Sequence, residues 1–166
     1  MHQKKKNGFT LLELLVATTL SAVLLLAVSS VFMTFLMSSA RTTIRRQVHS
    51  EGNEIRNRIE FLLRNSKVVT STCTGGNIVP IVFTTLDGNV VEIGTDGVDS
   101  LYTKLGTGTA TDLTTAETKA SGVKFVCSED ITTKIRVVTI QFTLTKTSDG
   151  VSASETFQSI VELRNS

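Results

Sequence analysis

The chain has 166 residues with one Pro, two Cys and no Trp, and its 17 basic and 15 acidic residues leave a net charge of +2. This length suits a single domain, and so small a positive charge argues against a nucleic-acid-binding protein. Apolar residues are concentrated near the start, because residues 9–40 hold 22 of them and the remainder is more polar. The pattern excludes an ordinary cytosolic globular protein and indicates an apolar segment attached to a small polar domain.

Residues 14–40 form an uninterrupted run of 27 residues without a formal charge. As a helix at about 1.5 Å per residue, the run spans roughly 40 Å, which exceeds the hydrocarbon core of about 30 Å. Its Leu, Val and Phe residues would lie all round the helix, which is unusual for a buried helix of a soluble protein. The run therefore predicts insertion into a membrane.

Two ordinary explanations of this segment leave one residue unexplained. A cleaved secretory signal would end at Ser38, Ser39 and Ala40, but the apolar run exceeds the roughly 7–15 residues of a signal core. An uncleaved anchor accounts for the length but not for Glu13 near the start of the apolar segment. A carboxylate costs about 2.5 kcal/mol or more near the bilayer centre and less near the interface, so Glu13 should have a partner.

The residues around Glu13 resemble the class III signal of type IV prepilins and pseudopilins. A short basic leader with Lys4, Lys5 and Lys6 ends in Gly8, followed by Phe9 and, four positions later, by Glu13. The resemblance implies that an inner-membrane prepilin peptidase and N-methyltransferase cuts between Gly8 and Phe9 and methylates the new amine. It also implies that this amine pairs with Glu13 of a neighbouring subunit when the filament assembles.

The same resemblance implies an α+β, pilin-like fold, in which a long N-terminal α-helix packs on a C-terminal antiparallel β-sheet. The expected segments are a leader (1–8), a transmembrane and filament-core helix (9–37), an amphipathic helix (38–66) and a β-rich extracytoplasmic domain (67–166). Weaker resemblances at residues 56–66 and 156–165 further suggest a minor subunit of the J-type pseudopilin or W-type pilin groups.

The amphipathic helix is also predicted from its own pattern. Apolar residues recur at helical spacing along one stripe, namely Ile44, Val48, Ile55, Ile59, Leu62 and Leu63. Gly52 interrupts the stripe and marks a bend, a close approach of a strand or simply a tolerated glycine.

Residues 38–67 carry a net charge of +4 and residues 68–166 a net charge of −4. Basic residues beside a membrane are attracted to anionic headgroups, although a solvated Arg-rich helix face is an equal alternative.

The C-terminal part of the sequence predicts strands separated by turns. The expected strand regions are residues 78–85, 90–93, 122–127, 135–145 and 151–163, with turns at residues 87–89 and 148–150. Within the last of these regions, Val151, Ala153, Phe157, Val161 and Leu163 share one face, apart from Glu155 and Ser159. Residues 103–121 are rich in Thr, Gly and Ala and are expected to form a surface loop.

Few residues indicate any chemistry in the exported part. Cys73 and Cys127 are expected to form a disulfide worth roughly 4 kcal/mol in an oxidising compartment, the alternative being two buried thiols. His49 is expected to be a solvated surface residue, and Asp96 with Asp99 supplies too few oxygens for Ca²⁺. We therefore expect no catalytic residues, no metal and no cofactor.

These features together predict a minor or tip subunit of a type IV pilus or of a type II secretion pseudopilus. The absence of Pro and Gly between Thr10 and Gly52 favours a minor subunit, since major pilins commonly carry one there. Expected partners are the peptidase, other pilin or pseudopilin subunits and the inner-membrane assembly platform, and nucleic acid only through a competence role. The expected location is a single-pass position in the inner membrane with the C-terminal domain extracytoplasmic, then a filament. The alternatives are a membrane-anchored adhesion or DNA-uptake module and a domain released after Ala40.

Overall fold

The computed structural model describes residues 10–163 except 72, 74, 98, 131, 133, 134 and 149. The chain divides into two compact units, Met1–Ala40 and Arg41–Ser166. One α-helix, α1 (Leu11–Arg64), contributes to both units, and all strands belong to the second. The expected division of the chain into four segments stays a prediction.

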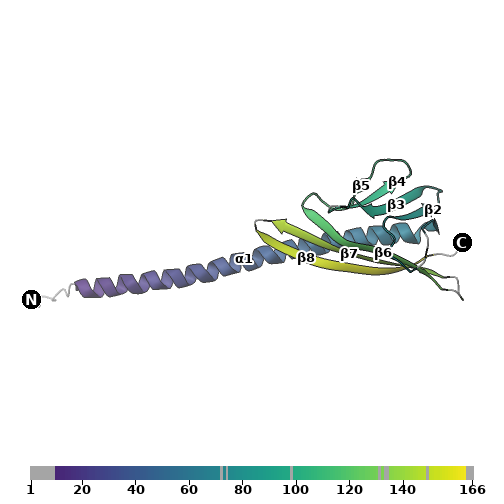
Figure 1. The fold of residues 1–166 in the computed structure, drawn as a ribbon. Helices are drawn as coiled ribbons and strands as arrows, with labels where there is room; N and C mark the ends of the chain where they lie inside the picture. Colours follow the sequence, from purple (N-terminus) through teal and green to yellow (C-terminus); the bar gives the residue numbers. More distant parts are fainter. Residues whose placement is uncertain are drawn as a thin grey trace, which may run out of the picture. The chain divides into compact units, whose positions relative to one another are not determined.

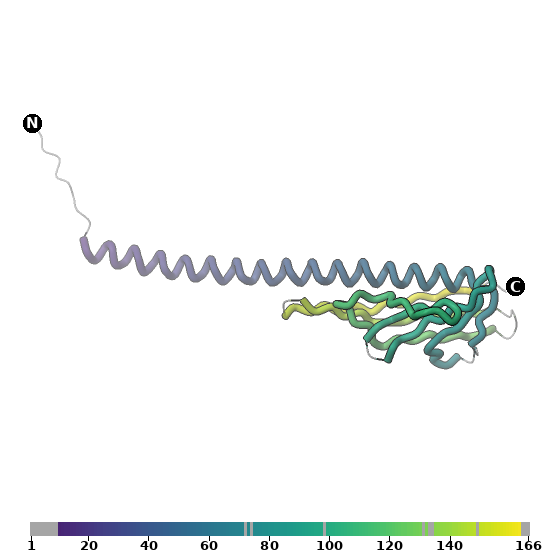
Figure 2. The backbone as a smooth tube through the Cα atoms, turned by 90° about the horizontal axis from the view of Figure 1, so that it is seen from above, coloured from purple at the N-terminus to yellow at the C-terminus, as the bar shows by residue number. Residues whose placement is uncertain are grey.

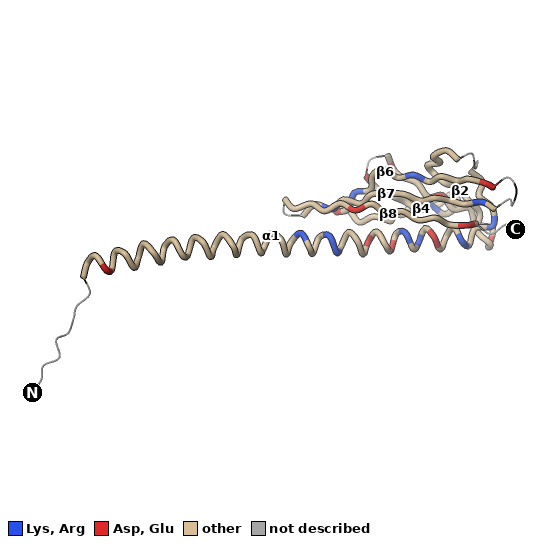
Figure 3. The backbone as a smooth tube through the Cα atoms, turned by 90° about the horizontal axis from the view of Figure 1, so that it is seen from below, with Lys and Arg blue, Asp and Glu red and all other residues tan. Residues whose placement is uncertain are grey.

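The part of α1 in the first unit has no protein cover. Every described residue from 10 to 43 is exposed, and large apolar side chains such as Leu11 and Leu26 are 84% and 73% exposed. This helix is long and apolar enough to cross a membrane. Figure 3 shows the uncharged stretch as a continuous tan segment, in contrast to the charged residues further along α1.

The second unit consists of the rest of α1 and two antiparallel sheets, which lie beside residues 41–64 of the helix (Figure 1). The first sheet has the order β1-β2-β3-β4-β5 and the second the order β6-β7-β8. Their bounds are β1 (Ser66–Val69), β2 (Ile81–Thr85), β3 (Val90–Thr95), β4 (Leu101–Leu105), β5 (Thr111–Asp112), β6 (Thr118–Glu129), β7 (Arg136–Ser148) and β8 (Val151–Leu163). In Figure 2 the strands follow one side of this part of the helix.

The α+β, pilin-like layout expected from the sequence is confirmed. Two details differ from the expectation. The strands form two sheets, and residues 103–121 are not one surface loop, because they include the end of β4, all of β5 and the start of β6. Thr114 and Thr118 in this stretch are 8% and 3% exposed. Thr is enriched in strands whereas Gly is depleted from them, so the mixed composition of this stretch could not locate these pairings.

The buried stripe of α1 runs without a gap through the second unit. Its members follow one another at spacings of three or four residues, as one helix face requires: Ile44, Val48, Gly52, Ile55, Ile59 and Leu63. The stripe expected from sequence is therefore correct except that Leu62 is half-buried and Gly52 belongs to it. These residues form one core with the inner faces of both sheets, including Phe83, Phe125 and Phe142.

Gly52 belongs to the buried stripe because an aromatic side chain lies directly against it. A Cβ atom at this position would overlap the ring of Phe157 from β8. That ring also stacks on Phe142, with ring centroids 5.4 Å apart. The glycine is thus a close approach to a side chain of the neighbouring strand, and α1 continues through it as a helix.

Candidate functional site

Glu13 lies in the first turn of α1 and forms a reciprocal cap with Thr10. The backbone N–H of Glu13 donates to Thr10 Oγ1, while the backbone N–H and the hydroxyl of Thr10 both donate to Glu13 Oε2, each at 3.3 Å. This is the capping-box arrangement, in which the first and fourth residues satisfy each other's free amides. The spacing of Thr10 and Glu13 contains this signal, although sequence reasoning about Glu13 concerned only its charge.

The cap leaves part of the Glu13 carboxylate available. Within the described residues, Oε1 of Glu13 accepts no hydrogen bond, and both contacts from Thr10 reach Oε2. The carboxylate also lies at the helix N-terminus, where the helix dipole favours negative charge. Its neighbours Leu11, Leu12 and Leu14 are exposed apolar residues. The site is thus a fixed carboxylate, with one free oxygen, at the edge of an uncovered apolar surface.

The remaining residues of the expected processing site lie outside the described part of the structure. These are Lys4, Lys5 and Lys6 of the leader together with Gly8 and Phe9 at the expected cut. Their assigned roles stay predictions from the sequence.

Cys73 and Cys127 form a disulfide, with their Cα atoms 4.6 Å apart. Cys73 lies in the connection between β1 and β2, and Cys127 lies fully buried in β6. The bond therefore joins the first sheet's connecting segment to the first strand of the second sheet. Asn77 reinforces this junction, because its side chain accepts a hydrogen bond from the Phe125 amide at 3.1 Å.

Several polar residues tie the sheets to α1. His49 is exposed, as expected, and its Nδ1 lies 2.8 Å from Oε1 of Glu155 on β8. Glu51 accepts hydrogen bonds from the Thr115 amide (2.9 Å) and the Thr118 hydroxyl (2.7 Å). Glu155 interrupts the apolar face of the last strand because the helix supplies its partner. No periodicity in the sequence could reveal such a pairing between distant residues.

Asp96 and Asp99, the two carboxylates weighed above as Ca²⁺ ligands, both have protein partners. Asp96 Oδ1 accepts the backbone amides of Asp99 and Ser100 at 3.1 and 3.0 Å, which makes this an ordinary turn. Asp99 pairs with Lys119. Among the described residues, no group of three or more His, Cys, Asp or Glu is placed to hold a metal ion.

Tyr102 has a clearly perturbed titration. Its hydroxyl donates to Glu92 Oε1 at 2.6 Å. This hydrogen bond, partial burial and the negative charge of Glu92 together raise the pKa of Tyr102 to about 12. The ring lies against Gly94 on the neighbouring strand, where a Cβ atom would come within 2.9 Å of the hydroxyl. The pair links β3 to β4.

Comparison with known families gives one match. Residues 3–29 match the model of the prokaryotic N-terminal methylation motif. No curated protein and no solved structure matches the chain. The matched residues mark a type IV pilin-like class III signal peptide. Together with the pilin-like layout, the motif supports a type IV pilin-like or pseudopilin-like subunit, and such subunits are structural proteins rather than enzymes. The motif further implies processing by a prepilin peptidase and assembly with other pilins.

Proposed function

We propose that this chain is a minor or tip subunit of a type IV pilus or a type II secretion pseudopilus. The observation that carries the proposal is the capped carboxylate of Glu13 at the start of a helix whose residues 11–43 are all exposed. Such a surface must be covered by lipid before assembly and by other apolar helices after it, because exposing so large an apolar area to water is energetically unfavourable. The methylation motif at residues 3–29 supports the same conclusion.

Assembly would begin with cleavage between Gly8 and Phe9, which creates a cationic amine one residue before the capping Thr10. The free Oε1 of Glu13 can accept a hydrogen bond from that amine of a neighbouring subunit, while Oε2 still accepts the two hydrogen bonds from Thr10. Each charge would then offset the desolvation cost of the other in an apolar surrounding. The pair would therefore fix the axial position of one helix against the next.

The minor role is supported by the continuity of α1. The helix runs from Leu11 to Arg64 with its only glycine at Gly52 and no proline. A helix without an early Pro or Gly is less able to kink or melt when subunits assemble, which favours a minor subunit over the main filament subunit. The location that follows is a single pass through the inner membrane, with the second unit outside the cytoplasm. The disulfide of that unit suits an oxidising compartment.

Two substitutions at Glu13 separate helix capping from ion pairing. Glu13→Gln keeps a side chain able to close the capping box but removes the charge. Glu13→Ala removes both. If the charge pairs with the amine, both variants should be cleaved normally, yet enter sheared filaments at least about tenfold less than the wild type, since breaking a buried pair costs about 3–5 kcal/mol.

Thr10→Val is the matched control, because it disrupts the cap and leaves the carboxylate. We expect it to be cleaved and incorporated close to wild-type levels. Mass spectrometry of the mature N-terminus should find methylated Phe9 in all variants. Wild-type incorporation of Glu13→Gln would contradict the ion pair and leave Glu13 as a cap. A mature chain beginning at Arg41 would contradict the whole proposal.

A further inference from the structure

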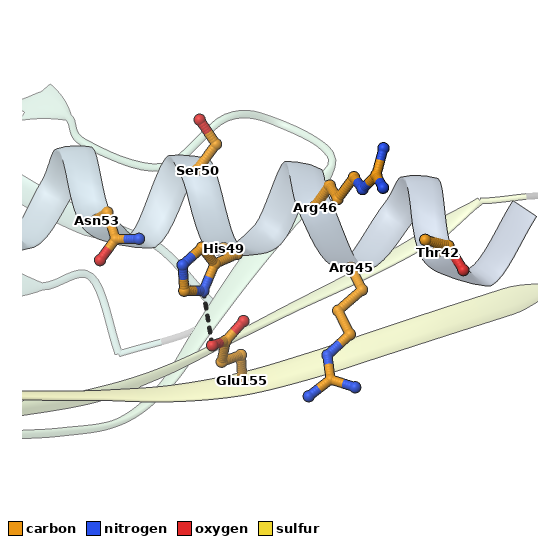
Figure 4. Close-up of a pocket in the computed structure, with 7 residues that line it drawn as sticks. All are labelled: Thr42, Arg45, Arg46, His49, Ser50, Asn53 and Glu155. Carbon is orange, nitrogen blue, oxygen red and sulfur yellow. Dashed lines mark hydrogen bonds and ion pairs between the residues drawn. The ribbon is translucent and has the colours of Figure 1, made fainter.

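A cationic hollow lies on α1 in the second unit, close to the point where the uncharged stretch of the sequence ends. It has a volume of about 600 Å³ and combines arginine, histidine and small polar side chains (Figure 4), namely Thr42, Arg45, Arg46, His49, Ser50, Asn53 and Glu155. All but Glu155 come from the helix. Neither the assembly site nor the packing of the sheets uses its two arginines.

The charges of the hollow are not balanced by the protein. Within the described residues, Arg45 and Arg46 form no ion pair and no hydrogen bond. The one carboxylate in the lining, Glu155, contacts His49 through Oε1 at 2.8 Å, and its buried Oε2 has no hydrogen-bond partner among the described residues, so the lining has two arginines against one carboxylate. In Figure 4 the dashed line joins these two residues, the Arg45 side chain extends toward the side of the helix where Glu155 lies, and the Arg46 side chain extends toward the opposite side. Two exposed guanidinium groups therefore remain for an external anion.

The position of the hollow along the helix selects the kind of anion. The last uncharged residue before it is Ala40, and Arg45 follows five residues later in the same helix. At about 1.5 Å per residue this is roughly 8 Å, which is close to the thickness of one headgroup layer of a bilayer. Guanidinium groups bind phosphate oxygens well because their planar N–H groups match two oxygens at once.

We propose that this hollow binds the phosphate group of an anionic membrane phospholipid while the subunit resides in the bilayer. Arg45 and Arg46 supply the positive charge, and the hydroxyl and amide of Ser50 and Asn53 provide neutral hydrogen-bonding groups beside it. The inference requires residues 14–40 to lie in a membrane. It does not depend on cleavage, on filament assembly or on which side of the membrane the second unit occupies.

The test uses the full chain in an uncharged detergent, with its arginine side chains labelled with ¹⁵N. Phosphatidylglycerol, phosphatidylcholine and inorganic phosphate are titrated in turn while the Nε–Hε resonances are followed by NMR. We expect phosphatidylglycerol to shift the Arg45 and Arg46 resonances selectively. Substituting both arginines with Gln should weaken this binding about 30-fold, on the basis of about 1 kcal/mol for each arginine at an anionic membrane surface.

Arg58→Gln is the matched control, since Arg58 is exposed on the same helix and lies outside the hollow. It should weaken phosphatidylglycerol binding less than about twofold. An equal loss of phosphatidylglycerol affinity in Arg58→Gln and in the double variant would indicate diffuse charge attraction and would contradict a specific site at the hollow. Equally tight binding of inorganic phosphate or phosphatidylcholine would overturn the assignment to an anionic lipid. The shifts in the unsubstituted chain keep the proposal testable even if the double variant does not fold.

Discussion

Replacing Gly52 with Ala tests how closely α1 is seated on β8. A Cβ atom at Gly52 would overlap the Cζ, Cε1 and Cε2 atoms of the Phe157 ring. Phe157 is 4% exposed and stacks on Phe142, so its ring has little space into which to move. The added methyl group must therefore displace either the ring or the helix.

Two effects of opposite sign decide the size of the change. Ala in place of Gly within a helix stabilises by about 1 kcal/mol. Overpacking a filled core costs about 1–3 kcal/mol, and the overlap with three ring atoms places Gly52→Ala at the upper end of that range. We expect the free energy of unfolding to fall by about 2 kcal/mol. For a unit of about 125 residues, this corresponds to a fall of about 8 °C in Tm.

The assay is thermal unfolding of the full-length chain in uncharged detergent, followed by circular dichroism. Asn57→Ala is the control, because Asn57 is exposed on the same helix and should show an unchanged or slightly higher Tm. In the Gly52→Ala/Phe157→Leu double variant, the loss should be smaller than the sum of the two single losses. A Tm for Gly52→Ala at or above that of the wild type would refute the reasoning from the overlapped ring.

The disulfide and the Tyr102 hydroxyl lead to two further predictions. Substituting Cys73 and Cys127 together with Ser should lower the free energy of unfolding by about 4 kcal/mol, given the length of the closed loop, and reduction of the wild-type chain should have the same effect in urea denaturation; an unchanged midpoint after complete reduction would contradict this. Tyr102 is the only tyrosine, so phenolate absorbance should titrate near pH 12, and Glu92→Gln should lower that pKa toward 10. Because folding raises this pKa, the stabilisation should be complete below about pH 10 and be lost as the pH rises through 12; a wild-type titration near pH 10 would show that the hydrogen bond to Glu92 is absent.

The elements that the sequence predicted best are those whose signal is local. The apolar stripe of α1 and the alternation of the last strand depend only on the period of the backbone, and both agree with the structure. The burial of Gly52 could not be predicted from the pattern of apolar residues. Glycine has no side chain, and it is buried here because the Phe157 ring lies against it.

The features that could not be predicted arise from contacts between distant parts of the chain. Glu155 and Ser159 are polar residues on an otherwise apolar strand face. In the structure Glu155 contacts His49, and Ser159 donates a hydrogen bond to Glu60, both on the helix. The division of the strands into two sheets likewise depends on pairings across residues 103–121, where composition does not distinguish strand from loop. The cationic hollow was visible only as a basic stretch, since its shape needs β8 beside the helix.

The disulfide has a mechanical consequence for a subunit that is pulled along its chain. Tension between the two ends of the polypeptide passes from Cys73 to Cys127 through the sulfur atoms, so residues 74–126 carry none of it. That shielded loop contains β2, β3, β4 and β5 in full. A pull strong enough to peel β8 from β7 would therefore still leave these four strands inside a closed covalent loop that the pull does not extend.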